Sequence, residues 1–350
     1  MLNNSNIKPI KIISTQKKDT LEIRWNPNNI CNFSCWYCFP GSNEGNHNSP
    51  NDLDLIIKNF NHLLNQYKNK LNKTNVDLKI AGGEPTLWKD LSLFLTEIKK
   101  ENNIYITLIS NGSRTLRWWK ENGHLIDNLH LSYHVKEANL NHTIDVADFM
   151  YDIGKKITVK VLMDPTCWDQ CIMAIEYLKK NSKNNFMIQV CEVLLPTDLK
   201  IKDIKIVNND LNYNKDQKKY LSNGLKRFPN ISWLWKNRKL IFSNKIRLYE
   251  SIAFLRNGKK LKAKSETYIN RSLNSFRGWE CNIGVESVYV HWDGSLIGSC
   301  GQKLYGLDHS INILDKDFIN KFNVELKPVI CSINSCPCQP ETHISKRCLA

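Results

Sequence analysis

Three cysteines, Cys31, Cys35 and Cys38, stand close together in the segment CNFSCWYC. Thiolates at this spacing hold three irons of a cubane [4Fe-4S] cluster, whose fourth iron ordinarily takes a fourth cysteine. The sequence offers no further cysteine nearby, so the fourth iron would be open to an external ligand. A zinc knuckle or three buried thiols is the alternative, although the segment lacks the paired CxxC motifs or the histidines of zinc modules.

The elements that position these cysteines follow the pattern of a parallel α/β sheet. Apolar, β-branched runs predict six strands, at residues 21–25, 76–80, 104–109, 129–133, 157–163 and 186–190. Segments with apolar residues at helical spacing separate them, at residues 53–64, 91–99, 116–125, 147–151 and 172–178, and a sixth helix is predicted near 217–225. The three cysteines therefore follow the first strand, at the end of the sheet where barrel-type folds carry their chemistry.

The composition is that of a globular protein larger than one average domain, with 350 residues of which 41% are hydrophobic and 24% charged. We expect a cytoplasmic protein without a membrane span, because no apolar run reaches about 18 residues and the N-terminus lacks the apolar segment of a secretory signal. In such a chain, 12 cysteines predict metal binding or catalysis rather than a disulfide scaffold. The net charge of +15 indicates either an anionic partner or a solvated basic surface.

The cysteine segment, with the aromatic residue Tyr37 directly before the third cysteine, resembles the signature of the radical S-adenosylmethionine (radical SAM) enzymes. The resemblance implies a partial (β/α)6 TIM-like barrel and a [4Fe-4S] cluster whose open iron is chelated by the amino and carboxylate groups of SAM. It also implies reductive cleavage of SAM to methionine and a 5'-deoxyadenosyl radical, which removes a hydrogen atom from the substrate.

The segment Gly82, Gly83, Glu84 and Pro85 follows the second predicted strand and resembles the part of this family that binds the SAM amino group. Glycines allow backbone carbonyls to approach an ammonium group, and a carboxylate adds a charge-assisted hydrogen bond. Taken alone, the same four residues would be an ordinary turn.

Further polar residues extend the resemblance over about residues 21–225. Ser110 and Asn111 resemble the segment near the SAM methionine and ribose, and Ser132 resembles a serine that reaches the ribose hydroxyls. Helix N-caps are the alternative for these short side chains. The resemblance further implies that Lys160 meets the SAM carboxylate, with an exposed lysine as the alternative, and that the backbone near Tyr37 and Phe39 contacts the adenine.

Cysteines are concentrated again near the C-terminus. Cys281 precedes and Cys300 follows a predicted hairpin, at residues 287–291 and 295–298, with a glycine in its turn. Together with Cys331, Cys336 and Cys338, this arrangement resembles the Twitch module, the shorter relative of the SPASM module, which holds one auxiliary [4Fe-4S] cluster. The resemblance implies Cys281, Cys300 and two of the other three as ligands, with a structural zinc as the alternative.

These observations predict four regions: a lead segment at 1–20, the radical SAM core barrel at 21–226, a connecting region at 227–275 and the Twitch/SPASM-like module at 276–350. Cys348 is either a spare ligand or a terminal thiol. Cys167 and Cys171 lie four residues apart on a predicted helix, where we expect them to fill the core.

Candidates for contact with substrate lie where the later predicted strands end: Tyr133, His134, Met163, Asp164, Gln189, Cys191 and Glu192. Cys191 is a candidate for returning a hydrogen atom to a substrate radical, with a buried core residue as the alternative. His134 and Glu192 are candidate proton acceptors in an oxidation.

The leading hypothesis is a radical SAM enzyme that abstracts a hydrogen atom from a small metabolite, with carbohydrates among the candidates. We expect no N-terminal peptide-recognition domain, because the cluster segment begins near residue 31. Modification of a ribosomally made peptide by oxidation, epimerisation or crosslinking is the alternative, RNA modification the next, and a zinc-stabilised binding protein the non-enzymatic one. The chemistry implies a reductant such as flavodoxin or ferredoxin.

Overall fold

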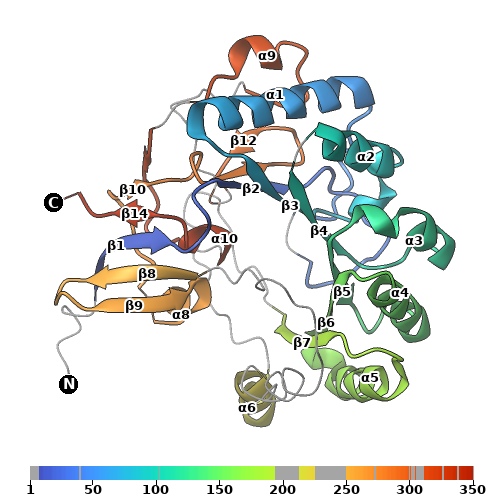
Figure 1. Cartoon of the computed structure of the whole chain (residues 1–350). Coiled ribbons are helices and arrows are strands. Elements are labelled where there is room, and N and C mark those ends of the chain that lie inside the picture. The colour runs from blue at the N-terminus through green and yellow to red at the C-terminus, as the bar shows by residue number, and fades with distance from the viewer. Residues whose placement is uncertain are drawn as a thin grey trace.

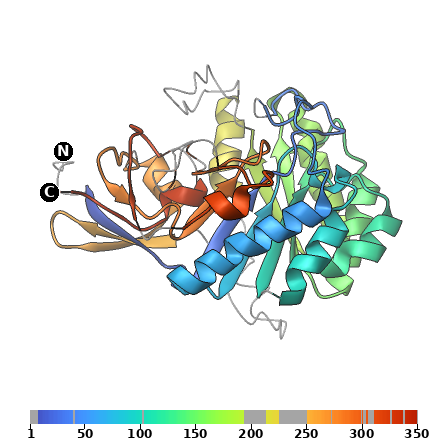
Figure 2. The same cartoon turned by 90° about the horizontal axis from the view of Figure 1, so that it is seen from above.

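The computed structural model describes residues 8–38, 41–101, 103–193, 213–224, 250–271, 273–298, 300, 304, 311–324, 327–336 and 339–349. Within these ranges the chain forms two sheets, and a layer of helices covers one of them (Figure 1). Seen from above, the second sheet and the helix-covered sheet lie side by side (Figure 2). In the described part of the chain, the helices are all too short or too polar to cross a membrane.

The first sheet contains the six predicted strands, all parallel and adjacent in chain order. They are β2 (Thr20–Trp25), β3 (Asn75–Ile80), β4 (Ile104–Ser110), β5 (Asn128–Tyr133), β6 (Lys156–Met163) and β7 (Met187–Glu192). The sheet curves, as expected for a partial barrel (Figure 1). The prediction of a parallel α/β sheet is confirmed.

Helices cover the outer face of this sheet (Figure 1). They are α1 (Leu53–Leu71), α2 (Leu91–Glu101), α3 (Leu116–Asn122), α4 (Leu140–Asp152) and α5 (Trp168–Asn181). Short 3-10 helices η2 (Pro85–Leu87), η3 (Gly123–Leu125) and η4 (Pro165–Cys167) lie between strands and helices, and α6 (Lys215–Gly224) follows β7. Asp52 begins α1 by accepting a hydrogen bond from the Leu55 N–H at 3.0 Å.

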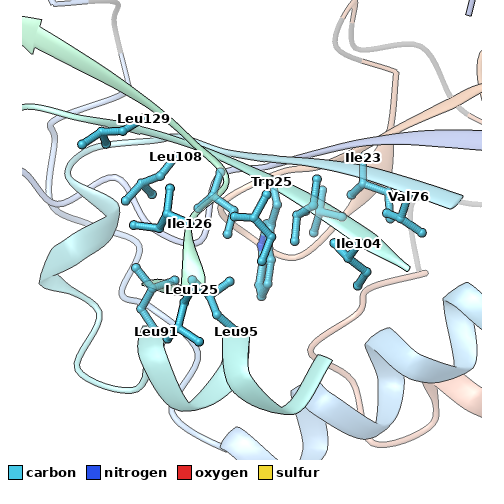
Figure 3. Packing of buried hydrophobic residues seen from close by; sticks show 14 of the residues in the cluster. Ile23, Trp25, Val76, Leu91, Leu95, Ile104, Leu108, Leu125, Ile126 and Leu129 are labelled. Carbon is cyan, nitrogen blue, oxygen red and sulfur yellow. The ribbon is translucent and has the colours of Figure 1, made fainter. Parts of the chain in front are cut away.

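The main core lies between the outer face of the sheet and the helices. Alternate residues of β2, namely Leu21, Ile23 and Trp25, are at most 1% exposed and belong to this core. The Trp25 ring lies 5.8 Å from that of Phe60 and 4.9 Å from that of Phe94, and Figure 3 shows it between the strands and α2. Because strand residues alternate between faces, the intervening residues of β2 lie on the concave face.

The predicted hairpin is confirmed as β11 (Ser287–Val290) and β12 (Leu296–Ile297), which pair antiparallel. Strand β11 also pairs in parallel with β2, where Tyr289 lies opposite Arg24. The hairpin thus extends the barrel sheet to eight strands, an attachment that the sequence did not indicate.

The second sheet joins distant parts of the chain in the order β13, β10, β14, β1, β8, β9. Its strands are β1 (Pro9–Ser14), β8 (Glu250–Leu255), β9 (Lys260–Lys264), β10 (Glu280–Cys281), β13 (Val329–Ile330) and β14 (Lys346–Arg347). Short helices α8 (Ser265–Asn270) and α10 (Gln339–Thr342) accompany it, whereas α9 (Phe318–Lys321) lies against α1 (Figure 1). The predicted lead segment therefore contributes β1 and the predicted connecting region contributes β8 and β9, whereas the domain boundaries themselves stay a prediction.

Candidate functional site

The cysteine loop leaves the C-terminal end of β2 and carries Cys31, Cys35 and Cys38, all partly buried. The Cys38 N–H donates to the Cys35 carbonyl at 3.0 Å. Burial, followed by the charges of Glu137, Cys31 and Cys38, raises the pKa of the Cys35 thiol to about 12. The three sulfurs are therefore near enough to influence one another.

The donor set of this loop differs from that of a single-metal site. Among the described residues, no three His, Cys, Asp or Glu side chains converge as the ligands of a single metal ion would. A zinc ion needs donors about 2.3 Å from one point, whereas the cysteines of a cubane each bind a different iron and lie further apart. Three neighbouring thiols on one loop fit a cluster better than a lone ion.

The double glycine after β3 lies directly against this loop. The Gly83 N–H donates to the Asn28 carbonyl at 3.1 Å, and the Glu84 N–H donates to the Ile30 carbonyl at 2.6 Å. A Cβ atom at position 83 would lie 2.1 Å from the Ile30 carbonyl oxygen, and Gly82 has a φ of +126°. Only glycines allow this close approach, which fixes the backbone immediately before Cys31.

Glu84 is fully buried and accepts four hydrogen bonds from the protein. Its Oε1 accepts from the Thr86 N–H at 3.0 Å, the Thr86 hydroxyl at 2.6 Å and the Ser110 hydroxyl at 2.8 Å, and its Oε2 accepts from the Asn111 N–H at 2.7 Å. Burial raises the pKa of this carboxyl, and the bonds from Thr86, Asn111 and Ser110 oppose the rise. Glu84 thus holds the end of β4 in place, while its contact with SAM stays a prediction.

Asn111 links the end of β4 to the cysteine loop. Its side-chain amide donates to the Cys31 sulfur at 3.7 Å and to the Asn32 side-chain oxygen at 3.0 Å. The chain Glu84, Asn111, Cys31 therefore connects the ends of the first three barrel strands. Pro85, buried at the start of η2, lies on the same turn.

His134, at the end of β5, contacts the cysteine loop. Its Nδ1 lies 2.9 Å from the Tyr37 hydroxyl and 3.2 Å from the Cys35 sulfur, and its ring stacks on Tyr37. Burial lowers the pKa of His134 to about 4, so the ring is neutral near pH 7. Its predicted role as a proton acceptor stays a prediction, because the partners that the structure gives it belong to the loop.

Other predicted site residues lie on the concave face or at strand ends. Ser132 and Lys160 are register partners on β5 and β6, and Lys160 pairs with Gln189 on β7. Cys191 is partly buried, and burial raises the pKa of its thiol although the Lys160 charge opposes the rise. Glu192 is exposed. Tyr133 and Met163 are buried in the main core. Phe39 and Cys338 lie outside the described residues.

The sequence analysis did not predict two contacts of the site. The side chain of Asn29 donates to the Gly41 carbonyl at 2.7 Å and accepts from the His47 N–H at 2.8 Å, which folds residues 41–47 over the loop. Asp164 accepts from the Trp36 indole N–H at 2.9 Å and caps η4 by accepting from the Thr166 N–H. The sequence Asp-Pro-Thr is an N-cap signal that would have indicated this role.

Four C-terminal cysteines, Cys281, Cys300, Cys331 and Cys336, line one cavity. They are 6–8% exposed and come from separate segments of the chain. The remaining lining residues are Phe276, Ile283, Ile333, Glu341 and Lys346. Burial raises the pKa of Cys281 to about 12. This donor set of four thiols fits a cluster with all of its irons ligated by protein.

The other cysteines lie apart from these two groups. Cys171 is fully buried in the main core and Cys167 packs against it, so their predicted core position is confirmed. Cys348 is exposed beyond β14.

Comparisons with known proteins agree with this geometry. Residues 25–196, which span the parallel strands from the end of β2 to β7, match the radical SAM superfamily. A curated relative, the GTP 3',8-cyclase of Pasteurella multocida (strain Pm70), is 30% identical over 140 residues. That match covers 37% of this chain and 38% of the relative, so the chain spans well under half of the relative's length.

A solved structure, described as native anSMEcpe with bound AdoMet and Kp18Cys peptide, shares the fold. It aligns with a TM-score of 0.51 at 17% identity, over 87% of this chain and 81% of that one. The parallel sheet and the cysteine loop at its C-terminal end agree with the family match, and residues 25–196 of this chain belong to the radical SAM superfamily of enzymes.

Proposed function

We propose that this enzyme binds a [4Fe-4S] cluster through Cys31, Cys35 and Cys38 and uses SAM to abstract a hydrogen atom from a small metabolite. The observation that carries the proposal is the three-thiol loop, fixed against the turn of Gly82 and Gly83 at the open end of the barrel. When bound, the cluster supplies the electron that splits SAM into methionine and a 5'-deoxyadenosyl radical.

The residues around the loop would hold SAM. Backbone carbonyls of Gly82 and Gly83 would accept from the SAM amino group, and Ser110 and Asn111, held by Glu84, would lie near its methionine and ribose. Ser132 and Lys160 would meet the ribose hydroxyls and the carboxylate, because both lie on the concave face. Tyr37 and Phe39 would border the adenine, with Tyr37 positioned by His134.

Cys191 is the proposed hydrogen-atom donor to the substrate radical. It lies on β7 and within electrostatic range of Lys160, where a substrate held in the barrel would pass. Glu192, one residue later, is exposed and is proposed as a proton acceptor only if substrate reaches the rim.

We propose that Cys281, Cys300, Cys331 and Cys336 bind one auxiliary [4Fe-4S] cluster. Their common cavity supports this choice among the C-terminal cysteines. Because four thiols would occupy all four irons, the auxiliary cluster would transfer electrons or stabilise the fold rather than bind substrate. A reductant such as flavodoxin or ferredoxin would supply electrons.

The relative from Pasteurella multocida, by its name, acts on GTP, and this supports a small metabolite as the substrate class. Modification of a peptide is the second candidate, because the solved structure with the same fold holds a peptide.

Anaerobic reconstitution tests the proposal. We expect about eight iron and eight sulfide per chain and formation of 5'-deoxyadenosine that depends on reductant. Cys35→Ala should abolish this product, whereas Cys348→Ala, a change of an exposed thiol outside both groups, should leave it unchanged. Stable zinc binding without SAM cleavage would show a zinc-stabilised binding protein instead.

A further inference from the structure

Two hydrogen-bond donors lie side by side on the concave face, where β2 meets β11. Arg24 and Tyr289 are register partners on these parallel strands, so their side chains leave the same face of the sheet. The Tyr289 hydroxyl accepts from the Asn26 side-chain amide at 2.7 Å, which orients it. Its own proton has no acceptor among the described residues, and the Arg24 guanidinium makes no hydrogen bond or ion pair with them. Arginine offers five N–H donors and no acceptor.

The carboxylates near Arg24 are engaged elsewhere. Lys79 lies 3.6 Å from Glu22 and 3.8 Å from Asp77, and His343 lies 3.6 Å from Glu22. Although burial acts to raise it, Lys79, His343 and Arg24 lower the pKa of Glu22 to about 2. Glu22 is therefore a charged partner of Lys79, and it does not hydrogen-bond to Arg24.

A second basic side chain without an acidic partner among the described residues lies on the same face. Lys160, on β6, makes no ion pair with a described carboxylate. Burial lowers its pKa, Cys191 opposes this decrease, and the Arg24 charge adds to it. His130, also on this face, is neutral because burial, Lys160 and Lys79 lower its pKa to about 3, and its Nδ1 is buried without a hydrogen-bond partner among the described residues. The face therefore holds three basic side chains, Arg24, Lys79 and Lys160, beside Glu22 and Asp77. Burial raises the pKa of Tyr289 to about 12, Arg24 and the hydrogen bond from Asn26 oppose the rise, and the charges of Glu341 and Asp293 add to it.

We propose that Arg24 and Tyr289 form a binding site for an anionic group of the substrate, a carboxylate or a phosphate. The inference rests on the proposed function and deepens it by naming the substrate class. Lys160 is already proposed to bind the SAM carboxylate, which leaves Arg24 to bind an anionic group of the substrate. A planar guanidinium beside a hydroxyl donor suits both oxyanions, and such charge-assisted bonds are stronger than neutral ones.

The site would orient the substrate. Arg24 precedes Trp25, the last residue of β2, after which the chain enters the segment that leads to Cys31. A substrate anchored at Arg24 would extend from β2 towards β6 and β7, where Cys191 lies. Arg24 and Tyr289 would thus bind and orient the substrate and would take no part in the cleavage of SAM at the cysteine loop.

Equilibrium dialysis of the reconstituted, SAM-loaded enzyme tests this site with two radiolabelled probes, inorganic pyrophosphate and succinate, at low ionic strength. We expect at least one probe to bind, and Arg24→Gln to weaken that binding about tenfold or more, as removal of a charge-assisted bond requires. Tyr289→Phe should weaken it less, and Arg24→Lys should retain part of it. Arg117→Gln, which changes an exposed arginine on α3, is the matched control and should bind as the wild type does.

The outcomes separate this inference from the proposed function. Binding of pyrophosphate alone identifies a phosphate site, and binding of succinate alone identifies a carboxylate site. The inference is overturned if neither probe binds the wild type, if Arg24→Gln binds it equally well, or if Arg24→Gln loses labelled SAM to the same extent, which would make Arg24 a SAM ligand. A protein that binds the probe but does not cleave SAM refutes the proposed function and leaves the anion site standing. Melting temperatures of Arg24→Gln and Arg24→Lys identify any variant that fails to fold.

Discussion

The two groups of cysteines differ in how the fold presents them. Cys31, Cys35 and Cys38 lie on one loop and are partly buried, whereas Cys281, Cys300, Cys331 and Cys336 come from separate segments and are buried around one cavity. Metal sites that bind substrate keep an open position, and structural sites are closed. The contrast is what the proposal expects of a cluster with an open iron on the loop and of a fully ligated cluster in the cavity.

Removal of one thiol from each group gives the largest expected difference. Cys35→Ala should lower the rate of 5'-deoxyadenosine formation by more than about a thousandfold, because SAM would have no cluster to receive electrons from. Cys331→Ala should lower the iron content from about eight to about four per chain and still allow SAM cleavage. Equal loss of SAM cleavage in both variants would contradict the assignment of separate roles.

The hydrogen bonds that Glu84 accepts beneath the cysteine loop should contribute strongly to the stability of the fold. Glu84→Ala leaves the Thr86 N–H, the Ser110 hydroxyl and the Asn111 N–H without their acceptor, so we expect the free energy of unfolding to fall by about 3 kcal/mol. Glu97→Ala, at an exposed position on α2, should change it by less than about 0.5 kcal/mol. Urea denaturation of the cluster-free protein measures both, and similar midpoints would show that the network under the loop contributes little.

Alkylation of the reduced, cluster-free protein compares the access to the two groups directly. We expect iodoacetamide to modify Cys35 at least about tenfold faster than Cys281. Burial raises the pKa of both thiols to about 12, so the difference comes from access, since Cys35 is partly exposed and Cys281 is buried. The exposed Cys348 should react before either. Mass spectrometry of peptides after timed quenching gives the order, and faster labelling of Cys281 than of Cys35 would reverse the proposed contrast.

His130, on the concave face, should make the free energy of unfolding depend on pH. His130 has a pKa of about 3 in the folded state and about 6.5 when unfolded, so between these values the unfolded chain binds a proton that the folded chain does not. Its contribution to stability is thus fully present above pH 6.5 and is lost as the pH falls, by up to about 1.4 kcal/mol per pH unit. His130→Gln should show a shallower decrease than the wild type between pH 6.5 and 4.5, and equal slopes would count against a buried neutral histidine.

The barrel strands and the thiol loop were predictable because their signals are local. The parallel strands carry apolar residues at alternate positions, since helices bury their outer face, and the spacing of Cys31, Cys35 and Cys38 is contained in eight residues. The turn of Gly82 and Gly83 was also located in advance. Its fit against Ile30 was not, because that contact depends on how two distant loops meet.

The second sheet was missed for the opposite reason. Strands β10, β13 and β14 are two residues long and carry no period. In β9, lysines alternate with Leu261 and Ala263, a pattern of period two that would have indicated a strand. The grouping of Cys281 with Cys300 followed from the hairpin, but the choice of Cys331 and Cys336 as their neighbours required the folded chain.

The pairing of β11 with β2 has a consequence for synthesis on the ribosome. Strand β2 emerges early, whereas its partner β11 is translated only after the rest of the barrel. A nascent chain held at that stage would present one side of β2 as an open edge that attracts other strands. Overproduction should therefore benefit from chaperones that shield this edge until translation has passed residue 290.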